Sequence, residues 1–442
     1  MPVPALSVDL YELTMGESYV AQGMADRPAT FSLFFRGLPA GWGYGLAAGL
    51  DAALDYLEQL TFSGEDVDYL RSTGLFRAAF LERLRSLRFS GDVRALPEGT
   101  LVFPDEPLLE VTAPILEAQI VETMVLNVVH LQTLIASKAA RCVEAAGGAT
   151  LVDFALRRSH GQDAGFAVAR ASSIAGFDAT SNVEAARRLS IPAAGTMAHS
   201  YVEAFASEAD AFRAFAESYP DGAILLVDTY DTLEGTRVAV EIGRELAARG
   251  HRLRGVRLDS GDLLEESRRA RALLDEGGLP DAVVFASGGL DERDVERLLS
   301  AGAPIGGFGI GSKLGVSVDA PFLDLVYKLV ELDGRPRRKL SPGKATLPGR
   351  KQVWRTTSAG LFDHDVLGLA DAPGRPAGEP LLVEAMRGGR RLRRESLPAI
   401  RDRARAQRLA LRAEHRALDA APYEVRIDPA LASLAAGSAP LR

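Results

Sequence analysis

Short apolar runs alternate with helical stretches from about residue 149 to residue 332, and this alternation is the feature that most constrains the fold. Each run is rich in β-forming residues and ends in a turn that contains Gly, Asp or Ser. The expected strands are ATLVDFA, IPAAG, AILLVDT, RGVRLDS, AVVFAS and IGGFGIG. The stretches between them have the apolar spacing of amphipathic helices. Strands joined through helices pair in parallel, so this region predicts a β/α barrel or a doubly wound α/β sheet.

The flanking regions have a different pattern. Residues 51–88 are helical in spacing, the stretch GDVRALPEGTLVFPDEPLLEVTAPI predicts short strands, and residues 115–146 predict one long helix. Turn-rich sequence and further strands follow residue 333. We therefore expect two domains, which are a discontinuous α/β domain from residues 1–114 and 333–442 and a β/α barrel domain from residues 115–332.

Composition excludes several classes of protein. The 442 residues carry a net charge of −8, which argues against general attraction to nucleic acid or to an anionic membrane. The Arg-rich stretch 396–418 has Leu and Ala at helical spacing, which favours a solvated amphipathic helix over an RNA contact. The single Cys142 excludes an intrachain disulfide and a Cys-based zinc site. The sequence has neither a signal-peptide pattern at its start nor an apolar run of about 20 residues, so we expect a cytoplasmic protein.

Polar and glycine residues follow each of the six expected strands. In strand order they are Phe154, Arg157, Arg158 and His160, then Thr196, His199 and Ser200, then Asp228, Thr229 and Asp231, then Arg257, Asp259, Ser260 and Asp262, then Ser287, Gly288 and Gly289, and finally the stretch GFGIGSKLG at residues 307–315. Ligands of parallel β/α proteins bind where strands lead into helices. The set therefore predicts a ligand-binding site at this edge.

Each of these residues also has a purely structural interpretation. Asp262 can cap the following helix, and Gly288 and Gly289 can simply permit a tight turn. Phe154 can belong to the core, and His199 can be a solvated loop residue. The structural interpretation is weaker for the set than for its members, because all six strand ends carry such residues.

The residue types at this edge indicate phosphate chemistry. Two glycine-rich turns can present backbone N–H groups to a phosphate, but neither matches a dinucleotide fingerprint or a P-loop. The carboxylates of Asp228, Asp231, Asp259 and Asp262 suit Mg²⁺ held through water beside a phosphate-bearing substrate. The sequence contains no histidine cluster that would predict a zinc site.

Several stretches, in order along most of the chain, carry a resemblance to a known family. They are DLYELTMGESYVAQG, FSLFFRGLPAGWGYGLAAGL, DFALRRSHG, GFDATSNVEAAR, GTMAHSYVEAF, VDTYDTLEG, VRLDSGDL, ASGGLDE, GIGSKLG and KLSPGKATLPGRKQVWR. With these the chain resembles nicotinate phosphoribosyltransferases, which are type II phosphoribosyltransferases. The resemblance implies an irregular β/α barrel beside an α/β domain built from both chain ends. It also implies a homodimer with active sites shared between subunits, and ATP-coupled joining of nicotinate to phosphoribosyl pyrophosphate as the first step of NAD salvage from nicotinate.

The resemblance also implies roles for single residues. His199 corresponds to the histidine that ATP phosphorylates, and a neutral imidazole is a suitable nucleophile near neutral pH. Phe154 corresponds to an aromatic residue that stacks on the pyridine ring, and Tyr11 to a tyrosine that reaches the ring from the partner subunit. Arg257 and Thr196 correspond to residues of the nicotinate site, where a guanidinium can bind the carboxylate.

The remaining implied roles concern the ribose and its phosphates. Arg157 and Ser200 correspond to substrate-site positions, and Asp259 to a carboxylate near the ribose, where positive charge develops as pyrophosphate leaves. The phosphate-binding turns contain Gly288, Gly289, Gly309, Gly311 and Ser312. As possible metal residues, acting through water, we note Asp228 and Asp262.

Other functions remain as alternatives at this point. Nicotinamide phosphoribosyltransferases carry an acidic residue where this chain has Ser181, and a neutral residue would not repel a carboxylate, so nicotinate is favoured. Quinolinate phosphoribosyltransferases must hold two carboxylates and are usually shorter. A sugar-phosphate-binding barrel without catalysis would not need the histidine, arginines and carboxylates. An aldolase would want a Schiff-base lysine or metal-bound histidines at strand ends, and neither is evident.

Overall fold

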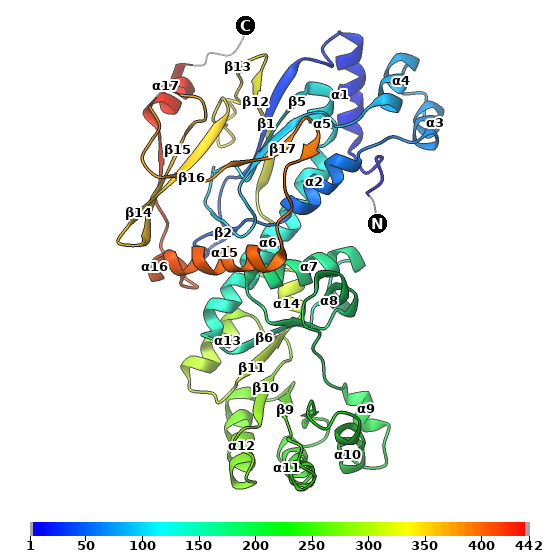
Figure 1. Cartoon of the computed structure of the whole chain (residues 1–442), viewed down its shortest axis with the longest axis vertical. Helices are drawn as coiled ribbons and strands as arrows, with labels where there is room; N and C mark the ends of the chain where they lie inside the picture. Colours follow the sequence, from blue (N-terminus) through cyan, green and yellow to red (C-terminus); the bar gives the residue numbers. More distant parts are fainter. Residues whose placement is uncertain (1–2, 373, 438–442) are drawn as a thin grey trace. The chain divides into compact units, whose positions relative to one another are not determined.

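The computed structural model describes residues 3–372 and 374–437, and the chain divides into two compact units. Unit 1 consists of Met1–Ser137 and Phe322–Arg442, and unit 2 of Lys138–Pro321. Both units contain helices and strands, so the protein belongs to the mixed α/β class (Figure 1).

Unit 2 contains a sheet of six parallel strands. They are β6 (Thr150–Asp153), β7 (Ala179–Thr180), β8 (Ile224–Leu226), β9 (Gly255–Leu258), β10 (Val283–Ala286) and β11 (Gly307–Ile310). The order β7-β6-β11-β10-β9-β8 places β11, the last of these six strands along the chain, beside β6, the first, as in a barrel. No pairing of the described residues joins β7 to β8, so the sheet is a parallel half-barrel.

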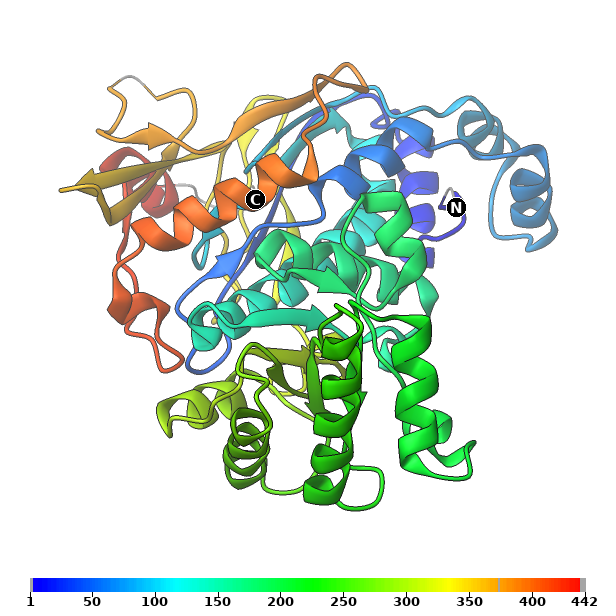
Figure 2. The ribbon, with the colours of Figure 1, turned by 60° about the horizontal axis from the view of Figure 1, so that its bottom comes forward.

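Helices follow the strands of unit 2. They are the 3₁₀-helix η1 (Leu156–Arg158), α7 (Gln162–Ala175), α8 (Val183–Leu189), α9 (His199–Glu203), α10 (Glu208–Ser218), α11 (Thr232–Ala248), α12 (Leu263–Glu276), α13 (Glu292–Ser300) and α14 (Ser312–Gly315). Helix α11 packs between α10 and α12 (Figure 2). Both α11 and α12 contact β9. Asp231, Asp262 and Asp291 cap α11, α12 and α13, because each side chain accepts backbone N–H groups of the first helical turn.

The prediction of a strand at IPAAG is wrong. This stretch forms only an isolated parallel bridge between Ala193 and Thr180, at the edge of β7. Pro192 supplies a carbonyl to the N–H of Thr180 but has no N–H of its own, so the ladder does not extend. The half-barrel is therefore open between this bridge and β8, in the part of the chain that carries Thr196 and His199.

Unit 1 is organised around antiparallel strands. Its seven-stranded sheet has the order β13 (Arg335–Pro336), β12 (Leu325–Leu332), β1 (Pro28–Phe35), β5 (Leu109–Pro114), β3 (Asp92–Ala95), β17 (Val383–Arg387) and β18 (Arg390–Arg391). A four-stranded sheet contains β16 (Glu379–Pro380), β14 (Lys351–Ser358), β15 (Leu361–Leu369) and β19 (Val425–Ile427), and β2 (Gly45–Leu46) pairs with β4 (Leu101–Val102). The helices are α1 (Leu10–Ala21), α2 (Leu50–Gln59), α3 (Gly64–Ser72), α4 (Ala78–Ser86), α5 (Ile115–Ile120), α15 (Leu397–Ala410), α16 (Ala413–Arg416) and α17 (Pro429–Gly437).

The long helix expected at 115–146 is two helices, α5 and then α6 (Glu122–Ala146), which begins in unit 1 and continues into unit 2. Residues 115–137 and 322–332 belong to unit 1 rather than to the β/α region. The reason is packing, since Val121, Val125 and Val129 are buried in the unit 1 core and β12 pairs with β1. None of the described helices is long and apolar enough to cross a membrane.

Candidate functional site

The predicted site residues of unit 2 gather at the carboxyl edge of the half-barrel. Because the strands are parallel, Phe154, Asp228, Asp259 and Ser287 leave the sheet at one edge. Arg257 lies inside β9, in register with Leu226 of β8 and Phe285 of β10. The structure therefore brings together side chains that are separated by more than one hundred residues.

Arg257 and Thr196 are in direct contact. The Nη1 group of Arg257 donates a hydrogen bond to the hydroxyl of Thr196, whereas its Nε is buried and has no hydrogen-bond partner in the described part of the chain. Burial lowers the pKa of Arg257 from its ordinary value, although Asp259 and Asp228 act in the opposite direction. Arg257 remains a cation at neutral pH, because arginine is the most basic side chain and is effectively always protonated in proteins. Arg257 is therefore a partly desolvated cation whose Nε donor is unsatisfied within the described residues.

Asp259 is held by its neighbours on both sides. Its Oδ1 accepts a hydrogen bond from the hydroxyl of Ser287, and its backbone N–H donates to Oδ2 of Asp228 over 2.9 Å. The hydroxyl of Ser260 donates to the same Oδ2 over 2.6 Å. Gly288 completes the arrangement, because a Cβ there would lie 1.9 Å from the carbonyl oxygen of Asp259. The carboxylate of Asp259 is therefore fixed in orientation before any ligand binds.

His199 is the first residue of α9, and its Nδ1 lies 3.1 Å from Oγ1 of Thr229. Thr229 follows β8, so this contact joins the open side of the half-barrel to the edge strand β8. His160 is exposed after η1. His130 belongs to unit 1, where its Nε2 accepts the N–H of Leu323, and burial lowers its pKa. Sequence reasoning placed Thr229 at a strand end but did not connect it to His199.

Phe154 is positioned by a buried carboxylate and a glycine. Asp153 accepts the N–H of Ala155 and the hydroxyl of Thr180, so it fixes the turn on either side of the aromatic residue. A Cβ at Gly309 would lie 2.3 Å from the Phe154 ring. Gly309 lies inside β11 and makes room for this ring, whereas its predicted role in phosphate binding stays a prediction. Asp153 was missed, although a carboxylate at the end of a buried strand is a signal that could have identified it.

The carboxylates at the edge divide into two groups. The capping interpretation of Asp262 is confirmed, since its Oδ1 accepts the N–H groups of Leu264 and Glu265. Oδ1 of Asp228, in contrast, is buried without a hydrogen-bond partner in the described residues. No group of three or more His, Cys, Asp or Glu side chains in the described residues could hold a metal ion by itself. Of the two predicted metal residues, Asp228 thus fits a cation that is shared with a phosphate, and Asp262 is occupied as a cap.

A further acidic residue, Glu208, was not predicted. It lies at the start of α10, and its Oε1 is buried without a partner in the described residues. Burial, with smaller contributions from the nearby carboxylates of Asp231, Glu234 and Asp228, raises the pKa of the Glu208 carboxyl to about 7. Its protonation state therefore changes near neutral pH.

The two glycine turns follow β10 and β11. Gly288 and Gly289 have φ angles of +97° and +71°, and Gly311 precedes α14 with Ser312 as the first helical residue. A Cβ at Gly311 would lie 2.9 Å from the carbonyl oxygen of Phe154, so this turn lies close to the end of β6. The remaining predicted residues of unit 2 are Arg157 and Ser200, which are exposed, and Ser181, which is partly exposed after β7.

Tyr11 belongs to unit 1 and lies on α1, where its side chain is 45% exposed. Partial burial and the nearby carboxylates of Glu122 and Glu12 raise its pKa above the ordinary tyrosine value. The phenol is therefore neutral at physiological pH. Its expected place in the site of a partner subunit stays a prediction.

The fold is that of a β/α protein, and its candidate ligand site is built from strand ends. The candidate site combines an arginine with an unsatisfied donor, an oriented carboxylate, a histidine and two glycine turns at one edge of a parallel sheet. Residues 6–130 match the nicotinate phosphoribosyltransferase (NAPRTase) N-terminal domain, and residues 149–346 match the nicotinate phosphoribosyltransferase (NAPRTase) family. The chain belongs to the nicotinate phosphoribosyltransferase family.

Individual relatives agree with this assignment. A nicotinate phosphoribosyltransferase of Mycobacterium tuberculosis is 51% identical over 423 residues, which cover 95% of this chain and 90% of the relative. The Bacillus subtilis enzyme is 45% identical over 79% of this chain and 73% of its own length. The crystal structure of human nicotinic acid phosphoribosyltransferase superposes with a TM-score of 0.86 at 32% identity, covering 98% of this chain and 99% of the human one.

Proposed function

We propose that this protein transfers the phosphoribosyl group of phosphoribosyl pyrophosphate to nicotinate, forming nicotinate mononucleotide and pyrophosphate in the first step of NAD salvage from nicotinate. The observation that carries the proposal is Arg257, whose buried Nε lacks a partner while Nη1 is bound to Thr196. A partly desolvated guanidinium with a free donor suits a carboxylate ligand. The similarity to enzymes named for this reaction supports the same substrate.

In this proposal Arg257 and Thr196 bind the carboxylate of nicotinate. Phe154 stacks on the pyridine ring, and Tyr11 of a second subunit stacks from the other side in a homodimer. Ser181 leaves the pocket neutral where an acidic residue would repel the carboxylate. The exposed Arg157 and Ser200 contact the substrate. Discrimination against nicotinamide then follows, because the uncharged amide would leave the guanidinium of Arg257 without its counterion.

Asp259 acts on the ribose. As pyrophosphate leaves the anomeric carbon, positive charge develops on the ring, and a fixed carboxylate stabilises it without having to reorganise. The hydrogen bond from Ser287 and the close approach of Gly288 support this role, since both restrict Asp259 to one orientation. The nicotinate nitrogen then forms the bond to the anomeric carbon. The phosphate groups are held by the turns with Gly288, Gly289, Gly309, Gly311 and Ser312.

ATP is the proposed second substrate. The Nδ1 atom of His199 is next to Thr229, which supports Nε2 as the nucleophile that takes the γ-phosphoryl group, leaving ADP. Water later removes the phosphoryl group from the histidine. Mg²⁺ would neutralise the phosphate charge, and the unpartnered Oδ1 of Asp228 suits it, with Asp262 contributing at most through water. We propose a cytoplasmic homodimer that binds neither nucleic acid nor membrane.

A pyrophosphate-release assay tests the proposal. Purified protein with phosphoribosyl pyrophosphate is given nicotinate, nicotinamide or quinolinate, each with and without ATP. We expect release with nicotinate, and more of it with ATP. Preference for quinolinate, or no release with any of the three, would refute the proposal.

A further inference from the structure

The two glycine turns are neighbours in the sheet. Strands β10 and β11 pair in parallel, with Phe285 in register with Gly307 and Ala286 with Phe308. The turn at 287–289 follows one strand and the turn at 311–312 follows the other. A phosphate that accepts N–H groups from both turns requires them at a fixed separation.

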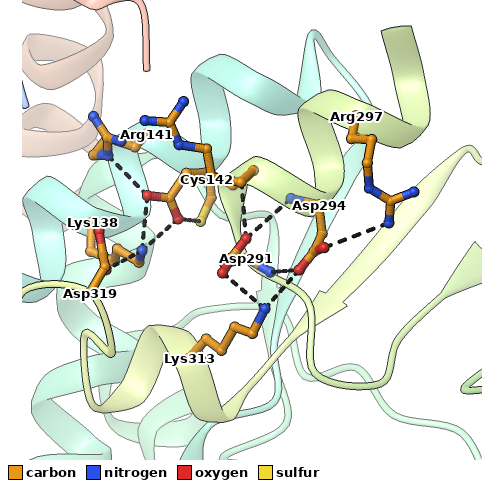
Figure 3. Close-up of polar contacts among 10 residues, drawn as sticks. Lys138, Arg141, Cys142, Asp291, Asp294, Arg297, Lys313 and Asp319 are labelled. Atoms are coloured by element: carbon orange, nitrogen blue, oxygen red, sulfur yellow. Dashed lines mark hydrogen bonds and ion pairs between the residues drawn. The ribbon is translucent and has the colours of Figure 1, made fainter. Parts of the chain in front are cut away.

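An ion pair joins the segments that follow these turns. The Nζ of Lys313, in α14, lies 3.0 Å from Oδ2 of Asp291 and 2.8 Å from Oδ2 of Asp294 (Figure 3). Asp291 caps α13, and Asp294 lies in its first turn and bonds back to the N–H of Asp291. Lys313 is the residue directly after Ser312. Its side chain therefore connects the segment after one glycine turn to the segment after the other.

The start of α13 is also anchored from a third element. Glu292 lies 2.7 Å from Nζ of Lys138 and 3.0 Å from Nε of Arg141, both on α6. All three side chains are at most 5% exposed. Lys138 also contacts Asp319, as Figure 3 shows. The helix α13 is therefore fixed independently of Lys313, so Lys313 serves to hold α14 and its turn against it.

The same lysine compensates charge next to the proposed phosphate site. Asp291 and Asp294 follow Gly289 by two and five residues, and two uncompensated carboxylates there would repel a phosphate. Burial alone would raise the pKa of Asp291, but the hydrogen bonds from Lys313 and from the N–H of Asp294, together with the charges of Lys313 and Lys138, lower it overall. Asp291 is therefore ionised at neutral pH and depends on its cation.

We propose that Lys313 is a positioning residue for phosphoribosyl pyrophosphate, since its ion pairs with Asp291 and Asp294 hold the two glycine turns at the separation a phosphate needs and cancel the carboxylate charge beside them. The inference rests on the proposed function, because it concerns the same phosphate turns. Lys313 touches no reacting atom in this scheme. Its loss weakens the binding of phosphoribosyl pyrophosphate and leaves the nicotinate site intact.

Three single variants and one double variant test the inference. Lys313→Met removes the cation and keeps much of the side-chain length, and Asp294→Asn removes one partner while retaining a capping side chain. The control is Arg297→Met, because Arg297 also approaches Asp294, at 3.6 Å, but lies on α13 itself and bridges no turns. The double variant Lys313→Met/Asp294→Asn reports whether the two residues act as one unit. Each protein is assayed for KM, kcat, melting temperature and calorimetric affinity for phosphoribosyl pyrophosphate.

We expect Lys313→Met to raise the KM and Kd for phosphoribosyl pyrophosphate by about tenfold, the size of one charged contact. The KM for nicotinate and kcat should change by less than about threefold, and Arg297→Met should resemble the wild type. The double variant should bind phosphoribosyl pyrophosphate no more weakly than Lys313→Met does. Unchanged affinity for phosphoribosyl pyrophosphate in Lys313→Met, an equal loss in Arg297→Met, or multiplicative losses in the double variant would overturn the inference.

Failure of the proposed function has a different signature. If the wild type binds phosphoribosyl pyrophosphate but forms no mononucleotide, the proposed function fails and the calorimetric affinities still decide the role of Lys313. If the wild type does not bind phosphoribosyl pyrophosphate, both are overturned. Should Lys313→Met fail to fold, the comparison of Asp294→Asn with Arg297→Met decides. Both variants break an ion pair of Asp294, but only Asp294→Asn breaks the ion pair with Lys313.

Discussion

The hydroxyl of Ser287 donates a hydrogen bond to Oδ1 of Asp259, and the Ser287 side chain is almost fully buried, with 2% exposure. The two residues end neighbouring strands, β10 and β9, so the bond spans the sheet edge at which we place the ribose. A buried serine that is hydrogen-bonded to a carboxylate in this way restricts the rotation of that carboxylate. Asp259 is therefore oriented by the protein and not by its ligand.

Ser287→Ala should lower kcat/KM by about tenfold, because loss of one hydrogen bond to a charged group leaves Asp259 free to rotate away from the developing charge. Steady-state kinetics with nicotinate measures this. The matched control is Ser267→Ala, which removes another buried serine of unit 2, bonded to the carbonyl of Leu264 on α12. Equal kinetics for Ser287→Ala and the wild type would show that Asp259 needs no such support.

Gly288→Ala should destabilise the protein more than Gly289→Ala. Both glycines have positive φ angles, which cost an alanine roughly 1–2 kcal/mol. Only at Gly288 does a Cβ also meet backbone, 1.9 Å from the carbonyl oxygen of Asp259, whereas nothing lies within 4 Å of a Cβ at Gly289. Melting temperatures of the two variants make the comparison. An equal decrease in both variants would contradict the close approach of Gly288 to the backbone of Asp259.

Glu208→Gln should raise the melting temperature at about pH 8 and have little effect near pH 4. The folded pKa of Glu208 is about 7, above its ordinary value of 4.5, so the folded state resists ionisation. Below both values the carboxyl is protonated in either state and contributes nothing. Between pH 4.5 and 7, Glu208 ionises in the unfolded state but stays largely protonated in the folded state. The free energy of unfolding of the wild type therefore falls as the pH rises through this range.

The control for this pH dependence is Glu276→Gln, at the exposed end of α12. Its melting temperature should follow that of the wild type at every pH. A Glu208→Gln variant that gained no stability at alkaline pH would show that Glu208 ionises without a penalty.

His199→Ala should abolish an acid-labile, base-stable label from γ-labelled ATP and should abolish ATPase activity. Weak ATP-independent synthesis should persist, because the departure of pyrophosphate depends on Asp259 and the phosphate turns rather than on covalent attack by histidine. His160→Ala is the control, since His160 is exposed after η1. A label that persists in His199→Ala and disappears in His160→Ala would show that His160, and not His199, is the phosphorylated histidine.

The sequence predicted the parallel β/α arrangement because alternating apolar runs and helical spacing are local signals. The caps at Asp262 and Asp291 were predictable for the same reason, since capping involves only the next three residues. The strand at 191–195 was predicted wrongly, because its apolar residues resemble a strand while Pro192 limits pairing to one bridge.

Contacts between distant segments could not be predicted from the sequence. The bonds from Ser287 to Asp259 and from Lys313 to Asp294 depend on which strands become neighbours, and no local pattern specifies that. Gly309 illustrates the same limit, because its position in a glycine-rich stretch favoured a phosphate turn while the structure places it against the Phe154 ring. The gathering of these residues at the strand ends was therefore predictable from the sequence, and the contacts between them were not.

The most direct test of the central claim is the ratio of kcat/KM for nicotinate to that for nicotinamide, measured with wild type and Arg257→Lys. We predict a ratio of at least about one hundred for the wild type, because the carboxylate pairs with the partly desolvated guanidinium of Arg257. The ratio should collapse in Arg257→Lys, since an ammonium cannot reproduce the planar fork. Equal turnover of the two substrates by the wild type, or an unchanged ratio in Arg257→Lys, would contradict the account.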